Sequence, residues 1–112
     1  MMCADPDEER LRAVQKTFPN IQTTTHYKDI LNNSDVHAVC VAAPTDLHYI
    51  ITKEALEHGK HVLCEKPLAM VPKECRELQV LADKKDKVLM VGHVFLFNAG
   101  IVWLKNYIQS GK

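Results

Sequence analysis

Three nearly uninterrupted apolar segments, at residues 36–43, 61–64 and 88–91, constrain the fold of this chain more than any other feature. They do not alternate between apolar and polar residues, so strands formed there would be buried on both faces. A segment with helical spacing of its apolar residues follows each of them after a short connection. Alternating buried strands and helices are typical of a parallel sheet covered by helices on both faces, so we expect an α/β fold.

The first third of the chain continues this alternation with shorter elements. Residues 1–5 are expected to form a strand, and the short, β-branched segment 21–25 an edge strand. Between them, Asp5 is expected to cap a helix that has Pro6 at its first position. A brief helical turn is expected at residues 27–31.

Four further positions predict where the later helices begin and end. Asp46 and Asn98 are expected to act as N-caps, and Gly59 is expected just beyond a helix C-terminus. Pro72 is expected to open a helix whose cap position holds Val71. Valine cannot cap, which costs that helix about 1 kcal/mol.

Charge and composition exclude several functional classes. The chain has 14 basic and 14 acidic residues in 112, so no positive excess favours nucleic acid or an anionic membrane surface. No apolar stretch approaches the ~20 residues that span a bilayer, and the first residues do not resemble a secretory signal. The four cysteines are widely spaced and stand mostly in apolar runs, which predicts reduced, buried thiols in a cytoplasmic protein.

Residues able to do chemistry gather where the predicted strands end. In parallel sheets, ligands bind beyond the carboxyl ends of the strands. Four segments occupy these positions in the sequence: Asp5, residues 44–48, residues 65–67 and residues 92–98.

These segments carry a resemblance to a known family. Ala-Pro-Thr-x-x-His at 43–48, Gly-Lys-His-Val-Leu-Cys-Glu-Lys-Pro-Leu at 59–68, Gly-His at 92–93 and Phe-Asn at 97–98 stand in the same order as in that family. The chain therefore resembles the NAD(P)-dependent oxidoreductases of the glucose–fructose oxidoreductase/inositol dehydrogenase/MocA family. The resemblance covers nearly the whole chain and implies a Rossmann-like sheet.

The resemblance implies a catalytic role for Lys66. It would place Lys66 beside the nicotinamide and the substrate hydroxyl, where a partly desolvated ammonium can donate to a developing alkoxide. The alternative for Lys66 is a solvated surface lysine. The resemblance also suggests a cis peptide before Pro67, although trans is the ordinary form.

The same resemblance implies the cofactor-binding residues. Glu65 would line the pocket, with a surface ion pair as its alternative. Pro44, Thr45 and His48 would approach the ribose and phosphates, although His48 could equally be an ordinary helix-face histidine.

Two further residues complete this set. His93 would face the pocket. Asp5 would accept hydrogen bonds from the adenosine ribose, slightly favouring NAD over NADP, if it does not serve as a helix cap instead.

No metal site is expected. His58 and His61 have tolerable spacing, but they straddle a glycine turn and no third ligand is evident.

Two departures from the family pattern bear on function. Gly59 is the first glycine, so the Gly-x-Gly-x-x-Gly turn that cradles a pyrophosphate is not found, nor is the strand before it. The missing strand would be central in the order 3-2-1-4-5-6, leaving the first two strands without a neighbour on that side. Residues 1–112 are thus expected to be a partial NAD(P)-binding domain, with 98–112 starting the connection to a substrate domain that the sequence lacks.

The expected function is that of a nucleotide-binding domain from an oxidoreductase acting on the CH–OH group of a sugar, cyclitol or sugar derivative. As a fragment it is expected to have little activity alone, and the full-length protein could form homo-oligomers. The alternative is a non-catalytic remnant that binds a nucleotide or pairs with another chain through an open sheet edge.

Overall fold

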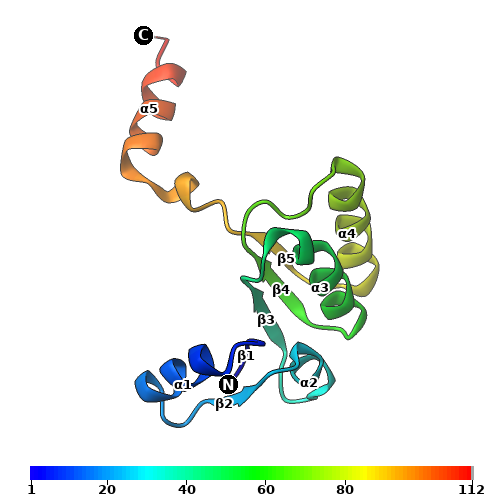
Figure 1. The fold of residues 1–112 in the computed structure, drawn as a ribbon. Coiled ribbons are helices and arrows are strands. Elements are labelled where there is room, and N and C mark those ends of the chain that lie inside the picture. Colours follow the sequence, from blue (N-terminus) through cyan, green and yellow to red (C-terminus); the bar gives the residue numbers. More distant parts are fainter. Residues whose placement is uncertain (112) are drawn as a thin grey trace.

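Strands and helices alternate along residues 1–111, which the computed structural model describes (Figure 1). The strands are β1 (Met2–Ala4), β2 (Gln22–Thr24), β3 (Ala38–Val41), β4 (His61–Cys64) and β5 (Leu89–Val91). The helices are α1 (Glu8–Thr17), α2 (Tyr27–Asn32), α3 (Thr45–Glu57), α4 (Pro72–Lys85), the 3₁₀ helix η1 (Val94–Phe97) and α5 (Ala99–Gln109). Every strand and helix expected from the sequence is therefore present, within a few residues at each end.

The strands form two separate parallel sheets. β1 pairs with β2, and β3, β4 and β5 pair in that order. The predicted lack of a joining neighbour is confirmed, because within residues 1–111 neither β1 nor β2 pairs with β3.

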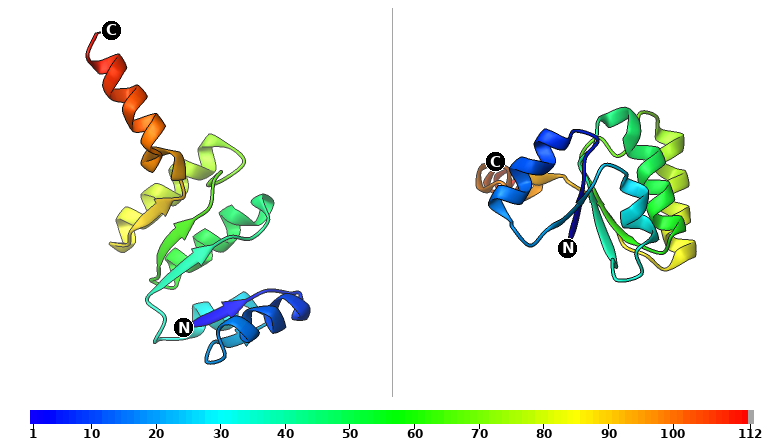
Figure 2. Two further views of the ribbon diagram at one scale, coloured as in Figure 1. Left: turned by 90° about the vertical axis from the view of Figure 1, so that its left-hand side faces the viewer. Right: turned by 60° about the horizontal axis from the view of Figure 1, so that its bottom comes forward.

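Helices α3 and α4 pack on one face of the three-stranded sheet and form the core with it. Leu56, Cys64 and Leu78 are completely buried there. Figure 2 shows α1 on the opposite side of the strands from α2, α3 and α4. The α/β fold with helices on both sides is thus confirmed for the molecule as a whole.

The expectation that each strand is buried on both faces is wrong for β3, β4 and β5. Cys40, Leu63 and Met90 form one row across these strands and are exposed. The reason is topological, since successive right-handed crossovers between neighbouring strands put α3 and α4 on the same face. Cys40 is consequently an exposed thiol and not the buried one that the sequence predicts.

Two of the predicted helix starts are also wrong. The side chain of Asp7, and not that of Asp5, caps α1, accepting from the backbone N–H groups of Glu9 and Arg10. Asp5 accepts from Asp7 N at 2.8 Å, which forms a turn that places Pro6 before the helix. Helix α3 starts at Thr45 with Pro44 at its cap position, so Asp46 lies in the first turn.

The other end predictions are confirmed. Gly59 has φ +72° just beyond α3, a conformation that suits glycine. Asn98 caps α5 through its side chain, whereas Val71 makes no side-chain cap bond to α4.

Helix α5 and η1 extend away from the two sheets (Figure 1). Neither contains a buried residue, although both are rich in large apolar side chains such as Phe97 and Trp103. Within residues 1–111, no helix has the length and apolarity needed to cross a membrane.

Candidate functional site

The register of β3, β4 and β5 brings three predicted site segments to one edge of the sheet. Val41, Cys64 and Val91 are paired across the three strands, so the residues that follow them are neighbours. Glu65 N donates to Val41 O at 2.9 Å, and Gly92 N donates to Cys64 O at 2.8 Å. We call this edge, with Pro44, Thr45, Glu65, Lys66, Gly92 and His93, the strand-end site.

Gly92 makes room for the Glu65 carboxylate within the strand-end site. A Cβ atom at position 92 would lie 3.0 Å from Oε2 and 3.2 Å from Cδ of Glu65. A side chain at position 92 would therefore push the carboxylate away from the end of β5. The sequence showed that Gly92 matches the family pattern but not this contact, which arises only when the strands pair.

Lys66 is exposed at this edge, and its peptide bond to Pro67 is cis, as the resemblance suggested. Among residues 1–111 no hydrogen bond or ion pair involves its ammonium group. The adjacent Glu65 is also exposed and likewise makes no ion pair within the described chain, so its alternative role in a surface ion pair is not seen. Both charged groups are thus accessible to a ligand.

The remaining predicted residues of this edge differ in exposure. Pro44 and His93 are exposed, and Thr45 is half-buried at the start of α3. His48 is 2% exposed. Its Nδ1 lies 2.8 Å from the carbonyl oxygen of Pro67, and its Nε2 lies 2.7 Å from that of Ala43.

Asp5 is not brought together with the other site residues, because it follows β1 in the separate sheet. Its carboxylate is half-buried and lies 3.7 Å from Nη1 of Arg10. Since Asp7 caps α1, Asp5 is free of the helix-capping role that competed with ribose binding.

The buried thiol nearest the strand-end site is unsuited to act as a nucleophile. Cys64 directly precedes Glu65, and burial raises the pKa of its thiol, an effect that the Thr52 hydroxyl partly opposes. A raised pKa keeps the thiol protonated at neutral pH.

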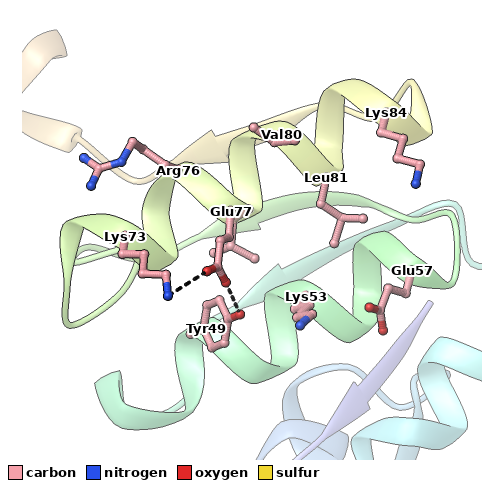
Figure 3. Close-up of a pocket in the computed structure, with 10 residues that line it drawn as sticks. Tyr49, Lys53, Glu57, Lys73, Arg76, Glu77, Val80, Leu81 and Lys84 are labelled. Atoms are coloured by element: carbon pink, nitrogen blue, oxygen red, sulfur yellow. Dashed lines mark hydrogen bonds and ion pairs between the residues drawn. The ribbon is translucent and has the colours of Figure 1, made fainter.

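A separate groove of the described chain lies elsewhere, between the outer surfaces of α3 and α4 (Figure 3). There Tyr49 donates to Glu77 at 2.7 Å, and Glu77 also pairs with Lys73. The hydrogen bond to Glu77 is the main cause that raises the pKa of Tyr49. None of the predicted site residues lines this groove, so we assign it no part in cofactor binding.

Sequence reasoning also missed a buried lysine. Lys60 is 6% exposed, and its ammonium donates to the carbonyl oxygens of Asn33 and Val36, both at 2.7 Å. It thereby ties the segment after α2 to the start of β4. Lysines are normally exposed, so the residue type gave no sign of burial. Its position beside Gly59 was the only signal in the sequence.

No three His, Cys, Asp or Glu side chains within residues 1–111 are grouped so that they could hold a metal ion. The two histidines of tolerable spacing are engaged with the backbone. His58 Nδ1 lies 2.7 Å from Glu54 O, and His61 Nδ1 accepts from Val88 N at 3.0 Å.

Known proteins share both the sequence and the fold of this chain. Inositol 2-dehydrogenase of Salmonella paratyphi B is 34% identical over 87 residues, covering 77% of this chain and 26% of that protein. The structure of levoglucosan dehydrogenase in complex with NADH and levoglucosan has a TM-score of 0.84 at 30% identity, covering 98% of this chain and 30% of the other. KijD10, a 3-ketoreductase from Actinomadura kijaniata in complex with TDP-benzene and NADP, has a TM-score of 0.89 at 28% identity, covering 99% and 35%.

The chain spans 24% to 30% of the length of eight curated relatives that it matches. Residues 1–93 match the sequence profile of the oxidoreductase family with an NAD-binding Rossmann fold. The ordered strand-end segments, the parallel sheet and this match over most of the chain lead to one conclusion. The chain belongs to the glucose–fructose oxidoreductase/inositol dehydrogenase/MocA family of oxidoreductases and contains part of its NAD-binding Rossmann domain.

Proposed function

We propose that this chain supplies the nicotinamide end of the NAD(P) site in an oxidoreductase that acts on the CH–OH group of a sugar, a cyclitol or a related compound. The substrate class follows the relatives, which include dehydrogenases of inositol and levoglucosan. In this assignment Lys66 is the catalytic residue. Asp5, Pro44, Thr45, Glu65, Lys66 and His93 contribute to cofactor binding directly, and the buried His48 contributes through the backbone groups that it contacts.

The observation that carries the proposal is the convergence of Glu65, Lys66 and Gly92 at the carboxyl ends of adjacent parallel strands. This edge is where ligands bind in sheets of this kind. The space beside Gly92 lets the Glu65 carboxylate lie at the end of β5. Its two acceptor oxygens suit the ribose hydroxyls or an amide of the cofactor.

Lys66 has the chemistry that alcohol oxidation and ketone reduction require of the protein. Its exposed ammonium can hold the substrate oxygen by hydrogen bonding. The ammonium can donate a proton as negative charge develops on that oxygen, which leaves a neutral amine that can accept a proton in the reverse direction. When bound, the nicotinamide supplies or takes up the hydride.

Asp5 and Arg10 together govern the choice between NAD and NADP in this proposal. A carboxylate at the end of β1 accepts hydrogen bonds from the ribose hydroxyls of NAD, whereas a nearby arginine suits the 2′-phosphate of NADP. The 3.7 Å contact between Asp5 and Arg10 sets these two preferences against each other. We place NAD slightly ahead, because the Asp5 carboxylate is the less exposed of the two groups.

Titration with NADH, followed by nicotinamide fluorescence, tests the proposal. We expect saturable binding that weakens about fivefold or more in Glu65→Ala and Lys66→Ala. Gly92→Ala should weaken binding while leaving the unfolding free energy nearly unchanged, since the atoms that must move end a flexible side chain. Glu57→Ala and Lys84→Ala remove exposed charges from the α3–α4 groove and serve as controls.

The absence of any fluorescence response to millimolar NADH or NADPH, with the chain folded by circular dichroism, would overturn cofactor binding by these residues. Comparing NADPH with NADH in Asp5→Ala and Arg10→Ala tests the preference. The first variant should lose mainly NADH affinity and the second mainly NADPH affinity.

The second candidate function is that of a non-catalytic protein that binds a nucleotide or another chain. It is favoured by the strand edges of β1 and β3, which are unpaired within residues 1–111. Such edges accept a further strand. Concentration-dependent association in sedimentation experiments, without any NADH binding, would favour this candidate over the first.

A further inference from the structure

His48 is the most deeply buried histidine of the described chain, and both of its ring nitrogens have partners there. It is 2% exposed in the first turns of α3. Its Nδ1 lies 2.8 Å from Pro67 O and its Nε2 lies 2.7 Å from Ala43 O. Ala43 stands between β3 and α3, whereas Pro67 belongs to the loop between β4 and α4.

Both partners are backbone carbonyl oxygens, which can only accept hydrogen bonds. A neutral imidazole has one N–H, so one of the two contacts would set a nitrogen lone pair against an oxygen lone pair. An imidazolium has two N–H groups and satisfies both oxygens. Turning the ring by 180° would replace both nitrogen contacts with C–H contacts, so it offers no comparable solution.

Two other histidines show that this arrangement is specific to His48. His58 is exposed and has one carbonyl partner, Glu54 O, for which a neutral ring suffices. His61 Nδ1 accepts the N–H of Val88, so this nitrogen carries no proton.

No charged side chain on the segments around His48 bonds to its ring within the described chain. Asp46 lies on the same helix, and Glu65 and Lys66 lie on the loop that contains Pro67. None of them forms a hydrogen bond or ion pair with the ring among residues 1–111. On the packed helix α4, Glu77 is bonded to Tyr49 and Lys73. Charge-assisted hydrogen bonds are stronger than neutral ones, and an imidazolium can make one to each of the two carbonyl oxygens.

We propose that His48 is a positioning residue: its imidazolium donates both N–H groups, to Ala43 O and Pro67 O, and so fixes the Lys66 loop against the end of β3. Pro67 directly follows Lys66, so the bond to its carbonyl oxygen limits where the lysine can lie. The consequence for Lys66 chemistry rests on the proposed function, whereas the protonation state of His48 does not.

Long-range ¹H–¹⁵N spectra of the unmodified chain at pH 7.5 test the protonation state without any substitution. We expect both ring nitrogens of His48 to have shifts in the protonated range. His61 provides the internal comparison, with one protonated and one unprotonated nitrogen. A His48 nitrogen in the unprotonated range at this pH would overturn the proposal.

Hydrogen exchange and NADH affinity test the positioning role. His48→Gln keeps a donor at only one atom, so we expect amide exchange at residues 65–70 to speed up about fivefold and the Kd for NADH to rise. His58→Gln, which also removes a ring bonded to a backbone carbonyl, should change neither. Unchanged exchange at residues 65–70 in His48→Gln would contradict the positioning role.

The two proposals fail in distinguishable ways. A doubly protonated His48 and faster loop exchange in His48→Gln, without NADH binding to the unmodified chain, would leave this inference standing and remove the proposed function. NADH binding together with a neutral His48 ring would do the reverse.

Discussion

The two sheets of this molecule differ sharply in how well they are buried. The β3–β4–β5 sheet packs against two long helices and contains the completely buried Leu56, Cys64 and Leu78. The β1–β2 sheet has two strands of three residues each, and in α1 only Leu11 is buried. A pair of short strands is marginally stable in water by itself. The strand-end site therefore lies at the edge of the better-packed sheet, whereas Asp5 follows a strand of the less buried one.

Contacts made by α2 and the segment after it join the two halves. Tyr27 donates to Glu54 on α3 at 2.8 Å, and Lys28 pairs with the same carboxylate at 3.4 Å. Burial and the contact with Glu54 raise the pKa of the Tyr27 hydroxyl. Lys60 adds the two carbonyl bonds described above, and Leu31 of α2 is buried in the core of the three-stranded sheet, so these contacts couple the two halves.

The largest effect is expected from cavities made in each half. Leu78→Ala should lower the free energy of unfolding by roughly 3 kcal/mol, because it empties the centre of the core. Leu11→Ala should cost less than about half of that, since α1 covers only a two-stranded sheet. Urea denaturation followed by circular dichroism measures both. Equal losses would contradict the difference in burial between the two sheets.

Removing the buried ammonium of Lys60 should destabilise residues 1–36 more than the rest of the chain. Lys60→Met leaves the carbonyl oxygens of Asn33 and Val36 without their partner, which should cost roughly 2 kcal/mol. Hydrogen exchange should accelerate mainly in residues 1–36. Lys85→Met, at an exposed lysine with one long contact of 3.4 Å, is the matched control. Uniform acceleration along the chain would contradict the assigned role of Lys60.

A new cap should sharpen the difference by strengthening the better-packed half. Val71→Ser gives α4 the N-cap side chain that it lacks and should raise the unfolding free energy by about 1 kcal/mol. Val80→Ser, at an exposed position in the middle of α4, should give no gain. A thermal melt that shows equal shifts for the two variants would contradict the capping explanation.

The smallest effect concerns pH and separates the two thiols of the three-stranded sheet. The raised pKa of buried Cys64 means that the unfolded chain loses this proton first, near the ordinary value of about 8.5. The unfolded state then binds fewer protons, so stability should fall as pH rises above about 8.5. Cys64→Ala should reduce that slope between pH 8 and 10.

Thiol reagents should modify exposed Cys40 first, and equal rates for both thiols would be evidence against the burial of Cys64.

Much of the fold could be predicted because its signals are local. The continuous apolar segments gave the strand positions, Gly59 and Asn98 marked helix ends correctly, and the strand ends held the residues that gather at one edge. The error at Asp5 arose because the neighbouring Asp7 has the same capping ability, whereas α3 starts before Asp46 with Pro44 at its cap position and without a side-chain cap. A choice between Asp5 and Asp7 depends on a turn only a few residues long, which periodicity does not resolve.

The sequence by itself determined the family, the alternation of strands and helices, and the separation of the first two strands from the other three. These follow from residue order, because apolar patterns and motif spacing act along the chain. Only the tertiary structure decided that Gly92 makes space for Glu65, that Lys60 is buried, and that His48 lies between two carbonyl oxygens. Each of these contacts joins residues separated by 5 to 27 positions, and the pairing and packing of whole elements is what brings them together.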